Sequence, residues 1–382
     1  MWLGLVSGLI VFIVAITGCV YVFQKEISEA WHHRVYFVQA PGSGNVPLSQ
    51  MMATAQKELG ADKPLEFITT YRDPRRTWEF TTYKEGRKDA ITYFSSLLYY
   101  KSVYIDPHTG HVAGVLDHKM AFFSIVKYLH WSLLLNTPYG QPIVGYATLV
   151  FVLMLITGLI MWWPRKWNKA NVQQRFKVKW KAGFKRVNYD LHNVPGFYVV
   201  LLALIISITG LVWAFSWVQA AVYVVASGST KPPATVITES HPGAGDTHTA
   251  TDIAFAAAWK ASPDAKRMGV DVPKEPKEAL SIFAYRGEET YYNFDELRFD
   301  QYSGRLLATI AYRHKNRGEK LIGMNYDIHT GAILGLPGKI LAFIASLVAA
   351  SLPVTGTVIY IGRRKKKKYA GPAGKTKVSA NV

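Results

Sequence analysis

The sequence predicts a membrane α-helical protein with four transmembrane helices, arranged as two tandem helix–insert–helix repeats. Two observations predict this fold. First, residues 2–23 align with residues 194–215 at an offset of 192, which sets Thr17-Gly18 beside Thr209-Gly210. Two later stretches pair at an offset of 198 or 199, which sets His130 beside His329 and Thr157-Gly158 beside Thr355-Gly356. Second, its 382 residues contain four apolar runs without Asp, Glu, Lys or Arg. Each run approaches or exceeds the roughly 20 residues that cross a hydrocarbon core. The runs are residues 1–23, 142–163, 194–218 and 340–362.

These runs divide the chain into eight predicted segments. Between the helices lie two large inserts and one short basic loop, and a basic tail follows the last helix. The predicted helices cover residues 1–24, 141–163, 194–218 and 338–362, the inserts 25–140 and 219–337, the loop 164–193, and the tail 363–382.

Each insert carries the pattern of a small α+β domain. Ile105–Val112 and Phe299–Leu306 both set an acidic residue and a glycine at a fixed spacing between β-prone residues, which predicts a strand, a tight turn and a second strand. Helical patterns precede them at Ser49–Gly60 and Asp252–Ser262. The two inserts are therefore expected to share one domain type.

The formal net charge of +18 is concentrated beside the membrane. The loop from Pro164 to Arg186 and the tail after Gly362 contain many Lys and Arg residues and no acid, and both flank apolar runs. The positive-inside rule then places the loop, the tail and both termini in the cytoplasm, and the two inserts outside. The predicted partner of these charges is the lipid bilayer, and nucleic-acid binding is not expected.

Several kinds of chemistry are excluded by composition. The single cysteine, Cys19, rules out a disulfide within the chain, a Cys-ligated iron–sulfur cluster and a C-x-x-C-H haem attachment. The sequence also lacks a G-x-G-x-x-G fingerprint, a P-loop and a Ser-His-Asp signature. If the protein is a reductase, its electrons come from a separate donor.

The four runs, the Asp-x-x-[Thr/Ser]-Gly turns, the repeated Thr-Gly pairs and His329-Thr330-Gly331 together resemble the PepSY-associated transmembrane family of iron-regulated bacterial inner-membrane proteins. The resemblance covers almost the whole chain and looks closest to the siderophore-reductase branch. It implies PepSY-like periplasmic inserts, haem b in the membrane, and reduction of a ferric siderophore at the periplasmic face with release of Fe(II). It also implies a separate quinol or cytoplasmic reductase as electron donor.

His130 and His329 occupy equivalent positions just before the second and fourth runs. The repeat places both near the outer face of one bundle, where two imidazoles could hold one haem iron from opposite sides in an apolar slot between helices. Zinc is less expected, because no Cys, Asp or Glu repeats with the two histidines. The alternative is that each histidine only caps a helix or lies among lipid headgroups.

His192 lies at the cytoplasmic start of the third run and predicts a second haem site. Gly196 follows four residues later on the same helix face, where a missing side chain would let a porphyrin approach the backbone. The counterpart of His192 falls one residue before Met1. Three interpretations stay open: a histidine precedes Met1, the inner haem has one protein ligand, or that haem is absent. The sequence thus predicts one or two haems.

The Thr-Gly pairs fit this layout by helix length. His192 and Thr209 are separated by about 26 Å of helix, at 1.5 Å per residue. Thr17-Gly18 and Thr209-Gly210 are therefore expected beside the outer histidines, and Thr157-Gly158 and Thr355-Gly356 beside His192. Close helix packing through small residues is a competing explanation, and both explanations can hold together.

His32 and His33 break the repeat, because Val224 and Val225 stand at the equivalent positions. They are candidates for an alternative axial ligand or for a substrate contact at the haem edge. The competing interpretation is the end of an amphipathic helix. The other histidines share no ligand spacing and are interpreted as surface or structural residues: His108, His111, His118, His241, His248 and His314.

A basic and aromatic patch lies in the first insert, where an anionic or hydroxamate ligand could bind. Its competing interpretation is a solvated strand edge. The patch comprises Tyr71, Arg72, Arg75, Arg76 and Trp78.

The sequence therefore predicts an oxidoreductase, a membrane cytochrome b that reduces ferric siderophore. One alternative is a haem-free, membrane-anchored binding or sensor module for a peptide, a peptidase or a siderophore. Another is a transporter for iron or siderophore, although the runs lack charged midplane residues and only Pro353 interrupts one deeply.

Overall fold

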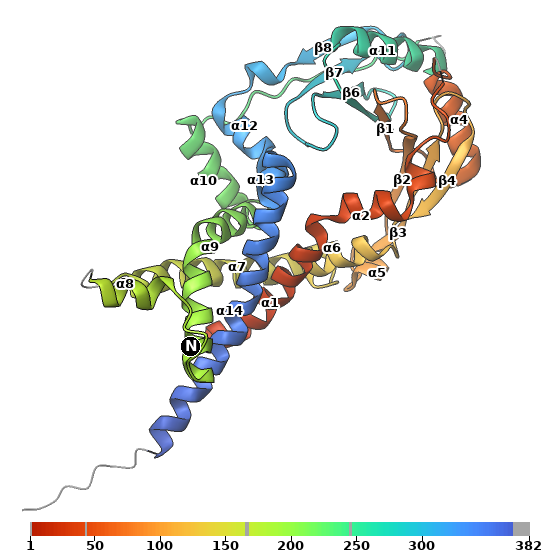
Figure 1. Ribbon diagram of the computed structural model, residues 1–382. Helices are drawn as coiled ribbons and strands as arrows, with labels where there is room; N and C mark the ends of the chain where they lie inside the picture. The colour runs from red at the N-terminus through yellow and green to blue at the C-terminus, as the bar shows by residue number, and fades with distance from the viewer. Residues whose placement is uncertain (1, 43, 165–167, 244–246, 370–382) are drawn as a thin grey trace, which may run out of the picture.

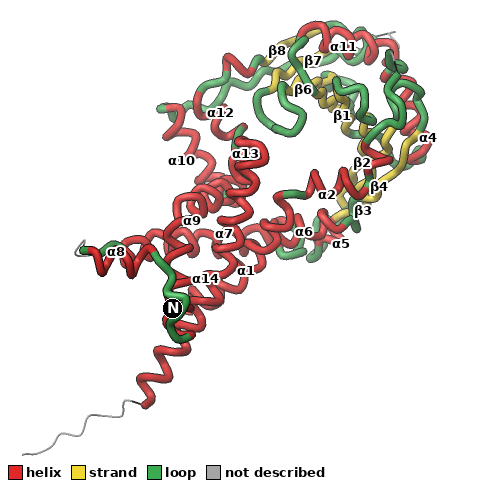
Figure 2. The backbone as a smooth tube through the Cα atoms, viewed as in Figure 1, coloured by secondary structure: helices red, strands yellow, loops and turns green. Residues whose placement is uncertain are grey.

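The computed structural model describes the chain except residues 1, 43, 165–167, 244–246 and 370–382. A helical bundle and a sheet-containing region lie at opposite ends of the molecule (Figures 1 and 2). Part of the predicted basic loop, including Arg165, Lys166 and Trp167, and the tail from residue 370 onward lie outside the described residues.

Four long helices form the bundle: α1 (Trp2–Val22), α7 (Thr137–Trp162), α9 (Phe184–Ala214) and α14 (Gly335–Tyr369). They are arranged as a ring, in which α1 contacts α7 and α14, and α9 contacts the same two helices. All four helices contribute to one core, made of Val11, Phe151, Leu155, Ala203 and Ala349.

The helices are suited to a lipid environment. Thr137–Trp162, Phe184–Ala214 and Ala332–Arg364 are long and apolar enough to cross a membrane. Val6–Val22 and Gln24–Trp31, bent by 51°, make a fourth span if they count as one. Outward-facing apolar side chains stay exposed on these helices, for example Leu201 at 67%. Because a soluble protein rarely exposes such continuous apolar surface, the bundle implies a bilayer around it.

Shorter helices connect the bundle to the inserts and to each other. They are α2 (Gln24–Trp31), α3 (His33–Tyr36), α5 (Tyr93–Ser96), α6 (Phe122–Ser132), α8 (Lys169–Phe176), α10 (Ser216–Ser227), α12 (Arg317–Gly323), α13 (Asn325–Thr330), and the 3₁₀ turns η1 (Tyr312–His314) and η2 (Ala332–Leu334).

The strands of both inserts form one antiparallel sheet of eight strands, in the order β4-β3-β2-β1-β5-β6-β7-β8. The sequence predicts a small α+β domain in each insert, and each insert does supply four strands and one helix that packs on the sheet. What the sequence did not predict is the joint, where β1 pairs with β5 and Tyr71 lies opposite Arg267. The strands are β1 (Phe67–Tyr71), β2 (Trp78–Glu85), β3 (Leu97–Ile105), β4 (Val112–Asp117), β5 (Arg267–Asp271), β6 (Leu280–Tyr285), β7 (Phe294–Phe299) and β8 (Leu306–Ile310).

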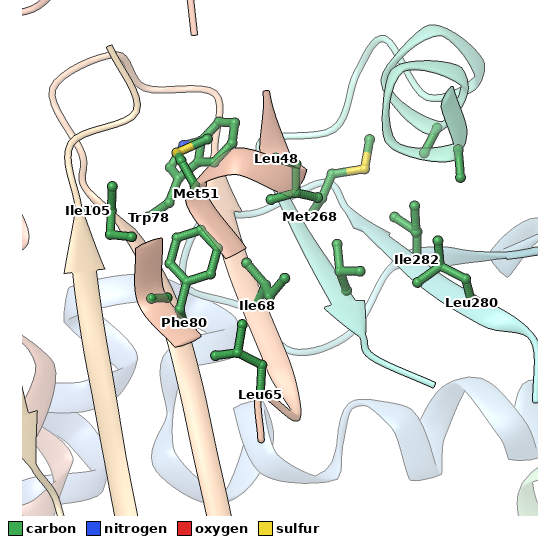
Figure 3. Close-up of a cluster of buried hydrophobic side chains, with 14 of the residues drawn as sticks. Leu48, Met51, Leu65, Ile68, Trp78, Phe80, Ile105, Met268, Leu280 and Ile282 are labelled. Atoms are coloured by element: carbon green, nitrogen blue, oxygen red, sulfur yellow. The ribbon is translucent and has the colours of Figure 1, made fainter. Parts of the chain in front are cut away.

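Helices α4 (Leu48–Leu59) and α11 (Thr247–Ala261) supply the side chains that bury one face of this sheet. Strand alternation sends apolar side chains to that face, where Ile68, Phe80, Met268 and Ile282 are fully buried (Figure 3). The core crosses the joint, so each half of the sheet is stabilised by the other. The opposite face carries Tyr104, which packs against Tyr36 of α3.

The two predicted turns are confirmed. The Asp106 carboxylate accepts the His108 N–H, and that of Asp300 accepts the Ser303 N–H, both at 2.8 Å. The glycines that end the turns, Gly110 and Gly304, have φ angles of 73° and 68°. A side chain is strained in this left-handed conformation, so glycine is needed there.

Candidate functional site

A cavity of about 1230 Å³ extends from the interior of the bundle, where Val11 and Ala349 line it, to the sheet face that carries Tyr71 and Glu79. Its volume exceeds the roughly 300–1000 Å³ typical of pockets for small ligands. His130 and His329 line it at the bundle, which we call the floor. The residues that line it at the sheet form what we call the roof: Tyr71, Arg76, Glu79, Tyr100, Tyr104 and Arg267.

The structure brings His130 and His329 together on the floor. His130 lies on α6 and His329 on α13, two short helices that precede α7 and α14. Their ring centroids are 6.0 Å apart, and the ring planes make an angle of 72°. Two histidines almost 200 residues apart in the sequence thus form one pair, as the internal repeat predicts.

Each ring is held at its Nδ1 atom by the neighbouring helix. Nδ1 of His130 lies 2.8 Å from the Val14 carbonyl oxygen on α1, and Nδ1 of His329 lies 2.9 Å from the Ile206 carbonyl oxygen on α9. A carbonyl oxygen can only accept a hydrogen bond, so Nδ1 must carry the proton. In the neutral ring this leaves the lone pair on Nε2, the form in which histidine binds a metal ion.

The Thr-Gly pairs complete these contacts. The hydroxyls of Thr17 and Thr209 lie 3.2 and 2.9 Å from the same Nδ1 atoms. A Cβ atom added to Gly18 or Gly210 would lie 3.3 or 3.4 Å from the Cε1 atom of the held histidine. The glycine therefore leaves room for the imidazole itself. We call the threonine, the glycine and the carbonyl three residues before the threonine an anchoring site.

A third anchoring site holds His192 at the far end of the bundle. Nδ1 of His192, on α9, lies 2.9 Å from the Thr355 hydroxyl on α14. A Cβ atom on Gly356 would lie 3.3 Å from Cε1 of His192, and the Leu352 carbonyl accepts a hydrogen bond from the ring. The three sites share one geometry at both ends of the bundle.

The fourth Thr-Gly pair, Thr157-Gly158, holds no histidine within the described part of the chain. The Thr157 hydroxyl donates to carbonyls of its own helix, those of Leu153 and Met154. A Cβ atom on Gly158 would meet no atom within 4 Å. The sequence predicts both inner pairs beside His192, but the structure places only Thr355-Gly356 there.

Two asparagines contribute to the anchoring sites and were missed by the sequence analysis. The Asn325 side chain donates to the Thr209 carbonyl, and that of Asn188 donates to the Thr355 carbonyl, both at 3.0 Å. Each asparagine precedes its histidine by four residues, which puts both on one helix face. The repeated Asn-x-x-x-His spacing was the available signal. At His130 the equivalent residue is Val126.

Comparison with known proteins places this arrangement in a family. Residues 1–363 match the model of the PepSY-associated TM region. The chain belongs to this family. A search of curated proteins gives no match. In this PepSY-associated protein, the repeated anchoring sites lie within the matched region.

Trp213 adds an aromatic contact to the floor of the PepSY-associated bundle. Its ring centroid lies 5.3 Å from that of His329 and 6.2 Å from that of Trp131. The sequence analysis did not foresee these contacts, because a tryptophan near the end of an apolar run is typical of a membrane interface.

Burial keeps the histidine pair neutral. It lowers the pKa of His130 and, together with the nearby His130 ring, lowers the pKa of His329 to about 3. Both groups lie outside the spanning segments. Neutral imidazole is the form that coordinates metals.

The other residues that the sequence predicts at a haem or substrate site lie outside the three anchoring sites. A Cβ atom on Gly196 would lie 3.3 Å from Leu352, so this glycine lies at a helix contact and its role beside a porphyrin stays a prediction. His32 lines the cavity, whereas His33 stacks on Phe37 with centroids 4.7 Å apart. Among the described residues, no group of three or more His, Cys, Asp or Glu side chains is arranged to hold a metal ion.

Proposed function

We propose that this protein is a haem b-containing inner-membrane reductase, which moves electrons outward and reduces a ferric siderophore to release Fe(II). In this proposal the bundle and its inserts form two tandem helix–insert–helix repeats. The sheet end of the bundle faces the periplasm, and both termini face the cytoplasm. The basic loop between α7 and α9 and the basic residues from Arg363 onward, most of them in the last turns of α14, support this orientation.

The observation that carries the proposal is the His130–His329 pair. Metal–imidazole bonds are about 2 Å long and a coordinating nitrogen lies about 1 Å from its ring centroid, so imidazoles on opposite sides of one metal ion have centroids about 6 Å apart. The observed 6.0 Å agrees with this value. The protonated Nδ1 atoms leave Nε2 of both rings available as ligands. The residues present therefore fit axial ligation of a haem.

Haem, when bound, would supply one-electron redox chemistry. The protein would supply its position and electrostatics. His130 and His329 would hold the haem iron. Thr17 and Thr209, with the carbonyls beside them, would fix the tautomer and orientation of both rings, as hydrogen-bond partners of metal-bound histidines generally do.

His192 would hold a haem iron at the cytoplasmic end, where the residues fit a haem only in part. One anchoring site is filled by His192, and the second, Thr157-Gly158, holds no histidine among the described residues. The described residues thus support one complete and one half-complete haem site.

The cavity above the floor is the place proposed for the ferric siderophore. It extends from the histidine pair to polar roof residues of both inserts, such as Glu79 and Arg267. A chelate held there would lie beside the redox centre. Hard oxygen donors bind Fe(III) far more tightly than Fe(II), so reduction would release the metal. The proposed electron donor is a quinol or a cytoplasmic reductase.

Electron transfer across a vesicle membrane tests the proposal. Protein reconstituted in liposomes is supplied with a membrane-soluble quinol, and ferric desferrioxamine B with ferrozine, an Fe(II) indicator, is placed outside. We expect ferrozine colour with the wild type and its loss with His329→Ala. A haem-containing wild type that gives no more colour than empty liposomes would contradict the reductase proposal. A haem-free protein that binds the chelate would favour the binding-module alternative.

A further inference from the structure

Two arginines of the roof are buried, although both line the cavity. Arg267 begins β5 in the second insert, and Arg76 precedes β2 in the first insert. Each has only 7% of its surface exposed. Buried charges are costly in protein interiors unless they are paired. The partners of these two groups therefore decide what the roof can bind.

The groups in direct contact with Arg267 are neutral. Its guanidinium lies 4.2 Å from the ring centroid of Tyr285 and 4.9 Å from that of Tyr291. Its Nη2 atom donates to the Thr290 carbonyl at 3.1 Å. Within the described residues, no carboxylate oxygen lies within 4 Å of it. Aromatic faces attract a cation and offset part of its desolvation, but they do not neutralise it.

Arg76 has a similar aromatic environment and is only partly paired. It lies 4.9 Å from the ring centroid of Phe37 and 5.0 Å from that of Tyr71. Its Nη2 atom lies 2.8 Å from the Glu29 carboxylate. Its Nε atom is buried and has no hydrogen-bond partner among the described residues, since the Glu288 oxygen is 3.9 Å away.

Of the other acids that line the cavity, Glu289 pairs with Lys25 and Lys339, and Asp117 lies 3.6 Å from Lys101. Two further acids accept hydrogen bonds from neutral donors. The Glu79 carboxylate accepts from the hydroxyls of Ser102 and Tyr104, both at 2.8 Å. The Asp327 carboxylate accepts the Tyr291 N–H at 3.0 Å. These contacts hold the two acids in place without making an ion pair to Arg267.

The two arginines meet where the inserts join. Tyr71, which stacks on Arg76, is the register partner of Arg267 across the β1–β5 pair. Strand partners point to the same side of a sheet, so Tyr71 and Arg267 face the cavity together. This arrangement requires both inserts, because each supplies one guanidinium.

We propose that Arg267 and Arg76 form an anion-binding subsite in the roof, which takes a carboxylate or another anionic oxygen group of the bound ligand. A guanidinium offers several N–H donors in a fork that matches such oxygens. Identification of the ligand as a ferric chelate rests on the proposed function. With that function, the inference names the substrate class as chelates that carry a net negative charge or a pendant carboxylate.

Two matched probes test the subsite without any redox step. Gallium(III) desferrioxamine B carries a pendant ammonium group, and its N-succinyl derivative carries a carboxylate in its place, while the metal sphere is unchanged. Binding of each probe to the detergent-purified full-length protein is measured by calorimetry. We expect the succinylated complex to bind at least about tenfold more tightly, and this preference to weaken as salt is raised. Equal or weaker binding of the succinylated complex would overturn the subsite.

Arg267→Gln removes the charge and keeps much of the side-chain volume. It is expected to lower affinity for the succinylated complex by about tenfold to a hundredfold and to leave affinity for the ammonium form almost unchanged. The matched control is Arg72→Gln. Arg72 also stacks on an aromatic ring, that of Trp259 on α11, at 4.6 Å, but it does not line the cavity. An equal loss in both variants would contradict the proposal.

The test of the anion subsite can be distinguished from the test of the proposed function. Haem content and Fe(III) reduction are measured on the same preparations. If the protein is haem-free but prefers the succinylated complex through Arg267, the anion subsite is supported and the reductase proposal is contradicted. If the protein contains haem and reduces Fe(III) but shows no charge preference, the proposed function is supported and the anion subsite is contradicted. The wild-type comparison of the two probes stands even if Arg267→Gln does not fold.

Discussion

The two ends of the helical bundle differ in how many anchoring sites they fill. At the sheet end, Thr17-Gly18 and Thr209-Gly210 hold His130 and His329, whose ring centroids lie 6.0 Å apart. At the far end, Thr355-Gly356 holds His192, while Thr157-Gly158 holds no histidine among the described residues. The same helix motif is therefore present at both ends, but within the described residues it holds a pair of histidines only at the sheet end.

This difference shows that the Thr-Gly motif can occur in a helix without a histidine beside it. The hydroxyl of Thr157 donates to its own helix as that of Thr209 does, so the threonine needs no histidine to be stable in the bundle. What the histidine adds is an Nδ1–H donor, and with it a defined Nε2 lone pair. The far end thus supplies internal controls for each part of the sheet-end site.

The largest expected effect is the loss of a floor histidine. His329→Ala or His130→Ala should remove the haem at the sheet end, because one axial ligand is lost from a site built for two. Haem per chain is measured by the pyridine haemochrome method on purified protein. His33→Ala is the control, since His33 stacks on Phe37 outside the pair. Full haem content in both floor variants would show that His130 and His329 are not the haem ligands.

His192→Ala should act at the far end only. We expect it to stop quinol-driven reduction across the membrane and to leave the sheet-end haem in place, since His192 lies about 26 Å of helix away from Thr209. Dithionite-reduced spectra and haem content report on the two sites. Loss of all haem in this variant would show that the ends are not independent.

Thr209→Val removes the hydroxyl at His329 and keeps the side-chain shape. Loss of a partner that orients a metal-bound histidine commonly costs about tenfold to a hundredfold in affinity. Haem titration into the haem-depleted protein measures this change. Thr157→Val is the matched control and should leave haem affinity unchanged. A similar loss in both variants would assign the effect to helix packing instead.

Alanine at the two far-end glycines should change thermal stability in opposite directions: Gly356→Ala should lower it and Gly158→Ala should raise it. Gly356→Ala brings a Cβ atom to 3.3 Å from His192, which must shift by a few tenths of an ångström. Gly158→Ala enters open space and should stabilise the helix by up to about 1 kcal/mol. Thermal unfolding in detergent compares the variants. A destabilising Gly158→Ala would show that this surface is packed.

The smallest expected effect concerns His108 in the first insert. Burial lowers the pKa of His108, but hydrogen bonds to the Gly44 and Pro74 carbonyls outweigh it and raise the pKa above its usual value. A raised pKa means that the folded state binds the proton more tightly. The added stability is therefore complete below about pH 6.5 and is lost as pH rises through the folded pKa.

Comparison of the wild type with His108→Gln checks this sign. The difference in melting temperature should be largest near pH 5.5 and should shrink towards pH 8. A difference that grows with pH would contradict it.

Sequence analysis predicted the architecture at the level set by local patterns. The length of the apolar runs predicted the membrane helices. The internal repeat predicted that His130 and His329 lie together, because equivalent positions in two repeats lie at the same end of the bundle. The joint of β1 with β5 could not be predicted, since the pairing of strands from two distant inserts leaves no local pattern. The sequence predicted Thr17-Gly18 beside the outer histidines, but not that Gly18 leaves room for the His130 ring itself, because a sequence does not show which group fills the space beside a glycine.

The measurement that tests the central claim most directly is the absorption spectrum of detergent-purified protein from haem-replete cells, oxidised and dithionite-reduced, with haem quantified per chain. The account predicts the spectrum of a six-coordinate b-type haem with two histidine ligands, at one haem per chain or more. A second haem would mean that His192 finds a partner at the Thr157-Gly158 site or binds alone. A colourless preparation would contradict the account and leave the cavity as a binding site without redox chemistry.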